Sequence, residues 1–122
     1  MKKSRFVKFL VLTLALVMLL NVTASAVSYY SWSCNGVSCH GECAATNAST
    51  VANSPMYIQV LVVCTYKDAN DFTKTTRNQA DNAGTRITAY VTLPSGSTQI
   101  YTEGVHWTGS CGPYYTDYGY YL

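Results

Sequence analysis

Residues 28–45 read SYYSWSCNGVSCHGECAA, and this stretch predicts how the chain folds. At its centre stands Asn35-Gly36. This dipeptide is typical of a two-residue β-hairpin loop, because a type I′ turn needs positive φ at both central residues. The turn fixes the register of the two flanking strands. The predicted cross-strand pairs are Cys34 with Val37, Trp32 with Cys39, Tyr30 with Gly41, and Ser28 with Cys43.

The predicted register sorts the hairpin side chains into two faces, since opposite residues share a face and neighbours along a strand alternate. The first face is apolar and carries cysteines: Tyr30, Trp32, Cys34, Val37, Cys39 and Cys43. The second face is polar: Tyr29, Ser31, Ser33, Ser38, His40 and Glu42. This contrast is typical of an antiparallel sheet that covers a core on one side and meets water on the other.

The first 26 residues have the pattern of a secretory signal peptide. A basic start, Met1-Lys2-Lys3, precedes an apolar run over residues 9–20 and the small-residue site Ala24-Ser25-Ala26. The apolar run is shorter than the roughly 20 residues of a membrane span. We therefore expect a cleaved signal peptide at residues 1–26, no stable membrane span, and one secreted all-β domain at residues 27–122.

Loss of the signal peptide would reverse the sign of the charge. The whole chain has eight basic and six acidic residues, a formal charge of +2. Four of the basic residues lie in the signal peptide, which leaves a charge of −2 for residues 27–122. A nucleic-acid-binding protein needs a basic stripe for phosphate contacts, so we expect no nucleic-acid partner.

All five cysteines lie in the predicted mature chain, where export favours disulfides. They are Cys34, Cys39, Cys43, Cys64 and Cys111. Because the number is odd, the simplest expectation is two bridges and one thiol that is free or joins two chains in a dimer. Cys34 and Cys39 are diagonal neighbours across the turn. Alternatively, Cys39 or Cys43 could meet Cys64 on a facing sheet, with Cys111 closing on a remaining cysteine.

The remaining segments predict further strands. Residues 56–67, MYIQVLVVCTYK, are apolar on both faces and predict a central strand. The polar residues 46–54 predict a loop or frayed edge strand, and residues 68–84 an exposed connection. Residues 85–93 and 98–107 predict a second hairpin around a turn at Pro94-Ser95-Gly96-Ser97, with Leu93 opposite Thr98.

Residues 111–122 predict a final strand. The expected fold is thus all-β: a small disulfide-stapled β-sandwich or open barrel of short antiparallel strands.

Aromatic residues supply the candidate binding surface, because tyrosine and tryptophan offer large amphipathic contact areas with few torsions to freeze. Five of the eleven tyrosines lie in the final segment. The candidates are Trp32, Trp107, Tyr114, Tyr115, Tyr118, Tyr120 and Tyr121. The alternative reading is that these rings complete the core or the sheet.

A zinc site formed by His40 and the hairpin cysteines conflicts with the hairpin itself. Cys39 and Cys43 are four residues apart on one strand, about 13 Å between Cα atoms. His40 points to the other face, whereas zinc holds its ligand atoms within about 2.3 Å. We therefore expect no metal and no cofactor.

Catalytic arrangements are formally possible but carry no signature. A free thiol could pair with His40 or His106, and Ser110 could join His106 and Asp117. The chain has no G-x-S-x-G, C-x-x-C or H-E-x-x-H motif. The sequence therefore favours a non-enzymatic secreted protein that binds a cell-surface, carbohydrate or protein partner. A bacteriocin-like antagonist is the main alternative, and a Cys/His-dependent hydrolase is a lower one.

Overall fold

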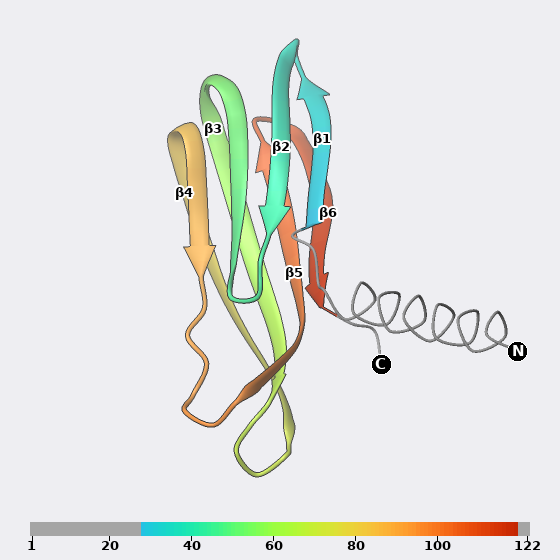
Figure 1. Ribbon diagram of the computed structural model, residues 1–122. Coiled ribbons are helices and arrows are strands. Elements are labelled where there is room, and N and C mark those ends of the chain that lie inside the picture. Colours follow the sequence, from blue (N-terminus) through green and yellow to red (C-terminus); the bar gives the residue numbers. More distant parts are fainter. Residues whose placement is uncertain (1–27, 120–122) are drawn as a thin grey trace, which may run out of the picture.

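The computed structural model describes residues 28–119, which form six antiparallel strands and no helix. The strands are β1 (Ser28–Cys34), β2 (Val37–Cys43), β3 (Asn47–Lys67), β4 (Thr73–Tyr90), β5 (Thr98–Thr108) and β6 (Cys111–Gly119). Their order in the sheet is β1-β2-β3-β5-β6, and β4 pairs with β3 (Figure 1). The predicted all-β class is confirmed: one antiparallel sheet nearly closes into a barrel.

The long hairpin of β3 and β4 bends the sheet into two layers. β3 has 21 residues and β4 has 18, and their register shifts between Val51 and Met56. Residues 48–52 of β3 pair with β2, whereas residues 58–67 pair with β5. We call β1, β2 and the adjoining parts of β3 and β4 the front sheet. The other parts of β3 and β4, with β5 and β6, form the back sheet (Figure 1).

The two sheets meet at a seam between β1 and β6, and no ladder of paired strand residues crosses this seam among the described residues. The Cys34–Cys111 disulfide crosses it, with 5.9 Å between the two Cα atoms. The Trp32 ring stacks on Tyr114 with 4.5 Å between ring centroids, and its Nε1–H donates to Thr108 Oγ1 at 2.9 Å. Side chains therefore close the barrel at this edge.

The inward face of β3 supplies most of the core. Ile58, Val60, Val62 and Cys64 are fully buried, and they alternate with partly exposed residues. The first core cluster contains Cys43, Ala48, Val60, Val62, Cys64, Ala89 and Val91. A second cluster near the seam contains Cys34, Cys39, Ala52 and Ile58.

A buried imidazole links the front and back sheets between these clusters. His106 of β5 pairs its Nδ1 with Thr50 Oγ1 at 2.9 Å and its Nε2 with Thr116 Oγ1 at 2.6 Å. Thr50 belongs to the front sheet and Thr116 to the back. Gly41 leaves room for the ring, because a Cβ there would lie 2.5 Å from His106 Cδ2. Burial, followed by the charge of His40, lowers the pKa of His106 to about 4, so the imidazole is neutral at pH 7.

The first predicted hairpin is confirmed in turn and register. Asn35 and Gly36 have φ values of 50° and 82°. Each predicted cross-strand pair from Cys34 with Val37 to Ser28 with Cys43 is present. The predicted strands at residues 56–67, 98–107 and 111–122 also correspond to β3, β5 and β6, as far as residue 119.

The polar segments were mispredicted. Residues 46–54 were expected to be a loop or a frayed edge strand, but residues 47–54 belong to β3, and residues 48–51 pair with both β2 and β4. Residues 73–84 are most of β4 and not a connection. The first half of β4 pairs only with β3 in the back sheet, so it is an edge strand. Natural edge strands carry charged and polar residues that discourage intermolecular pairing, and this composition resembles that of a loop.

The second predicted hairpin was also wrong. The Pro94–Ser97 turn exists, since Ser97 N–H donates to Pro94 O at 3.1 Å. However, β4 and β5 do not pair with each other; both pair with β3. Leu93 therefore does not face Thr98 in a ladder, and two long bent strands replace the short strands that were expected.

The cysteines form one bridge where two were the simplest expectation. Cys34 pairs with Cys111, while Cys39, Cys43 and Cys64 are buried free thiols. The suggested pairings of Cys39 with Cys34, and of Cys64 with Cys39 or Cys43, are absent. Cys111 begins β6 just after the turn from β5, and the fold places this turn next to Cys34. The pairing depends on the order of the strands in the sheet, which the spacing of the cysteines does not reveal.

Candidate functional site

The outward face of the front sheet gathers polar side chains from several strands. The register aligns Ser31 of β1, His40 of β2, Val51 of β3 and Arg86 of β4 in one row. The next row aligns Tyr29, Glu42, Ser49 and Thr88. Opposite residues share a face, so both rows point away from the core.

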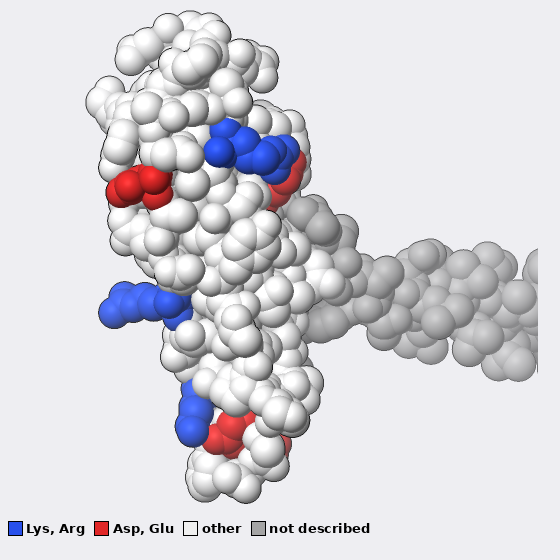
Figure 2. All heavy atoms as spheres, turned by 90° about the vertical axis from the view of Figure 1, so that its left-hand side faces the viewer, with Lys and Arg blue, Asp and Glu red and all other residues white. Residues whose placement is uncertain are grey.

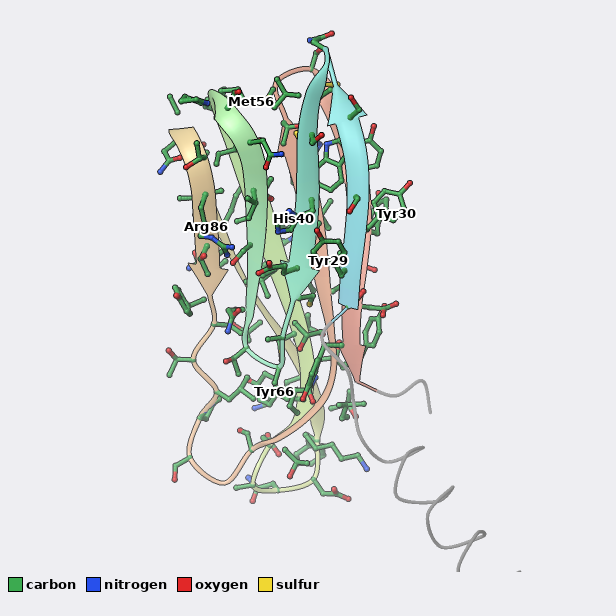
Figure 3. The ribbon with its side chains drawn as sticks, turned by 45° about the horizontal axis from the view of Figure 1, so that its top comes forward. Tyr29, Tyr30, His40, Met56, Tyr66 and Arg86 are labelled. Carbon is green, nitrogen blue, oxygen red and sulfur yellow. A yellow bond between two sulfur atoms is a disulfide. The ribbon has the colours of Figure 1, made fainter. Side chains whose placement is uncertain are left out.

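Tyr29, His40, Glu42 and Arg86 form a continuous chain of contacts across this face. The Tyr29 ring stacks on His40 with 4.7 Å between centroids and 25° between planes. His40 Nε2 lies 3.0 Å from Glu42 Oε1, and Arg86 Nη1 lies 3.3 Å from Glu42 Oε2. Figure 3 shows Tyr29, His40 and Arg86 on the same side of the molecule.

The charges in this chain hold Glu42 ionised. Partial burial alone would raise the pKa of its carboxyl, but the hydrogen bonds from Arg86 and His40 outweigh burial and lower it. The imidazole and carboxylate are thereby fixed beside the Tyr29 ring. Such a fixed set of donors and acceptors is suited to orient a polar ligand.

A hollow of about 590 Å³ lies beside this chain of contacts, and we call it the front hollow. Its lining residues are Tyr29, Ser31, Trp32, Ser38, Cys39, His40 and Asn53. Tyr29 is 60% exposed, so part of its ring remains open to a ligand. The lining thus combines an aromatic ring with hydroxyl, imidazole and amide groups.

Two of the three buried thiols, Cys43 and Cys64, are poorly suited to act as nucleophiles. Burial raises the pKa of Cys43 to about 12 and also raises the pKa of Cys64. Catalytic thiols instead have lowered pKa values, because the thiolate is the reactive form. Both ring nitrogens of His106 are engaged by threonine hydroxyls.

The Ser110, His106 and Asp117 combination is not assembled. His106 is buried and faces the core, whereas Asp117 points outward from β6 beside Glu103. Ser110 lies exposed in the turn between β5 and β6. The three side chains therefore do not converge on one point.

The predicted aromatic residues separate into distinct places. Trp32 and Tyr114 stack together at the seam, where Tyr30 joins them. Trp107 and Tyr115 point outward from the back sheet, and Tyr118 packs against the core. Tyr120, Tyr121 and the predicted signal peptide at residues 1–26 lie outside the described residues.

The surface charges are mixed. On the face that Figure 2 shows, basic and acidic side chains of the described residues are interspersed and form no continuous basic stripe. Among residues 28–119, no three His, Cys, Asp or Glu side chains are grouped so that they could hold a metal ion. Nor does this part of the chain include a helix with the length and apolarity that crossing a bilayer requires.

The sequence placed Tyr29 and His40 on one polar face, but it raised His40 only as a possible zinc ligand or thiol partner and did not single out Tyr29. The hairpin register was the signal that could have done so. Asn53 and Arg86 could not be found in this way, because residues 46–54 were predicted to be a loop or frayed edge strand and residue 86 was predicted to lie on a strand paired with residues 98–107. Only the bend of the β3–β4 hairpin brings both residues to the front sheet.

Comparisons of the whole chain with protein-family models, with curated proteins and with solved structures find no match.

Proposed function

We propose that this chain is an exported, non-catalytic binding protein that recognises a saccharide in the front hollow. The observation that carries the proposal is the lining of that hollow, where the open ring of Tyr29 lies among hydroxyl, imidazole and amide groups. A sugar ring presents an apolar C–H face and a rim of hydroxyls. An aromatic ring with a few convergent polar groups matches both features.

The size and rigidity of the site support the same function. Small-molecule sites typically measure about 300–1,000 Å³, a range that includes the front hollow. His40 is held by Tyr29 on one side and by Glu42 on the other, so little side-chain freedom is left to lose on binding. The Cys34–Cys111 disulfide supports export, because such bonds persist in oxidising compartments.

The test is binding to a panel of cell-wall and cell-surface polysaccharides, followed by calorimetry on the best ligand. Tyr29→Ala should raise the Kd about tenfold or more, which corresponds to about 1.4 kcal/mol. Tyr90→Ala is the matched control, because Tyr90 is 63% exposed on the same sheet but does not line the hollow. Mass spectrometry of the recovered saccharide should show no cleavage or modification.

Three results would overturn this proposal. The first is a failure to bind any saccharide in the panel, and the second is equal binding by Tyr29→Ala and wild type. The third is turnover of the saccharide, which would make the protein an enzyme. Inhibition of the growth of neighbouring bacterial strains, with no saccharide bound, would point instead to a secreted antagonist.

A further inference from the structure

The outward face of the back sheet is apolar at its centre, unlike the front face. Leu61, Val105 and Tyr115 lie directly opposite one another on β3, β5 and β6. Val63 lies beside this row, and Trp107 flanks it on the other side. Tyr115 is 58% exposed, whereas Val105 at the centre of the row is only 6% exposed and the other three residues are half-buried. We call these outward residues the back face.

A charged row runs beside the apolar centre. In order across β4, β3, β5 and β6 it contains Arg77, Val63, Glu103 and Asp117. Glu103 and Asp117 are a directly opposed cross-strand pair, an arrangement that is unfavourable for like charges. The row therefore has an excess of negative charge at one end and a cation at the other.

Arg77 differs from the other basic residues of the described chain. Lys67, Lys74 and Arg86 each lie within 4 Å of an acidic partner, at 3.6, 3.0 and 3.3 Å. Arg77 makes no ion pair within residues 28–119 and is exposed. Three strand spacings separate it from Asp117, about 14 Å, so the two residues cannot pair within one sheet.

We propose that the back face binds a second copy of this chain, with a two-fold axis running along the strands between β3 and β5. The rotation places Arg77 of each copy over Asp117 of the other, at both edges of the contact. It also places Leu61 over Val105 at the centre, with Gln59 over Trp107 on one side of this pair and Val63 over Glu103 on the other.

This arrangement follows the ordinary rules of sheet packing. Two sheets stack about 10 Å apart with their strands inclined by about 30°. The resulting offset at the edges is within the reach of an arginine side chain. The interface is isologous, because each pair of contacting residues occurs twice. It leaves both front hollows exposed, on opposite sides of the dimer, and it does not depend on what they bind.

The test is sedimentation equilibrium of the purified chain under non-reducing conditions, over a range of concentrations and without any saccharide. We expect a reversible monomer–dimer equilibrium. Tyr115→Ala should raise the dimer Kd about tenfold or more, since Tyr115 is the most exposed aromatic side chain of the back face and would lie over Gln79 of the other copy. The control is Tyr90→Ala, an equally exposed tyrosine on the opposite face, which should leave the Kd unchanged.

A charge exchange provides the sharpest version of this test. Arg77→Asp and Asp117→Arg should each weaken the dimer about tenfold or more, because each opposes like charges across the interface. The double variant should recover most of the wild-type affinity, since its pairs are reversed but intact. Recovery can arise only between copies, as the two positions are too far apart within one sheet.

A protein that stays monomeric at every concentration would refute the proposed dimer. The same holds for a dimer that none of these substitutions weakens, or one that separates only on reduction and is therefore held by cysteines. Circular dichroism on each variant identifies any that fails to fold. In that case Tyr115→Phe and Arg77→Gln, which alter the back face less, should show smaller losses in the same direction.

Discussion

The two outward faces of this barrel differ although they are built on the same strand, β3. Its first half contributes Ser49, Val51 and Asn53 to a front face that also carries His40 and Arg86. Its second half contributes Leu61 and Val63 to a back face that includes Trp107. Both faces lie opposite a well-filled core. This difference is the basis of the two roles proposed above, binding of a saccharide by the front face and of a second copy of this chain by the back face.

The largest expected effect comes from breaking the covalent link between the two sheets. The Cys34–Cys111 bridge closes a loop with a sequence separation of 77 residues, so Cys34→Ala should lower the free energy of unfolding by about 4 kcal/mol. Urea denaturation under oxidising conditions measures the loss. Cys39→Ala is the control: it removes a buried free thiol, leaves the bridge intact and should cost less than half as much.

Reduction should also cause aggregation, because residues 56–63 of β3 form an apolar, uncharged and β-prone segment. Light scattering during reduction measures this aggregation directly. A reduced protein that remains folded, without particles larger than a dimer, would contradict it.

Protonation of His106 should weaken the second link between the sheets, the hydrogen bonds of its imidazole to Thr50 and Thr116. Its pKa is about 4 in the folded protein, below its usual value of 6.5, so folding disfavours the charged form. Stability should therefore be unaffected above pH 6.5, fall as the pH drops from 6.5 to 4, and level off below. The integrated loss is about 3 kcal/mol. Denaturation midpoints over this pH range measure it, and the profile of His106→Gln should be flatter and start from a lower value.

How far the sequence could predict this fold depended on the range of the interactions. The Asn35-Gly36 turn acts over two residues, so the register and polarity of the first hairpin followed directly from local rules. The bend between Val51 and Met56 is different in kind. This bend allows β3 to pair in both sheets. No local pattern in residues 46–54 distinguishes this part of β3 from a loop or a frayed edge strand.

The candidate site could be predicted only in part, for the same reason. Tyr29 and His40 come from a local hairpin, whereas Arg86 reaches Glu42 across a sequence separation of 44. The burial of His106 was equally hidden, because its partners Thr50 and Thr116 lie on separate strands. A lone histidine beside a tryptophan reads as a surface or packing residue until the topology places it between the sheets.

A smaller effect should follow from filling the space beside His106. In Gly41→Ala the new Cβ would clash with the imidazole, and we expect a loss of about 1–3 kcal/mol in the free energy of unfolding. Gly84→Ala is a matched control on β4, since its Cβ would meet only Asn82 Oδ1 at 3.4 Å. Equal unfolding free energies for the two variants would show that the ring is not held tightly between the sheets.

The smallest effect separates binding from stability on the front face. Arg86→Ala removes an exposed ion pair with Glu42, and such pairs contribute about 0–1 kcal/mol to folding. We therefore expect nearly unchanged thermal unfolding but weaker saccharide binding, because Glu42, which holds His40 in place, loses its contact with Arg86. Calorimetric titration and thermal unfolding of the same sample check this; a large loss of stability with unchanged binding would be the opposite outcome.

Amide NMR of the labelled protein tests the division between the two faces most directly, with saccharide and protein concentration varied separately. We predict that saccharide shifts the signals of residues lining the front hollow, such as Tyr29, His40 and Asn53. Protein concentration should instead shift those of Leu61, Val105 and Tyr115. Saccharide-dependent shifts centred on Trp107 and Tyr115, or concentration-dependent shifts centred on the front hollow, would contradict the assignment of separate roles to the two faces.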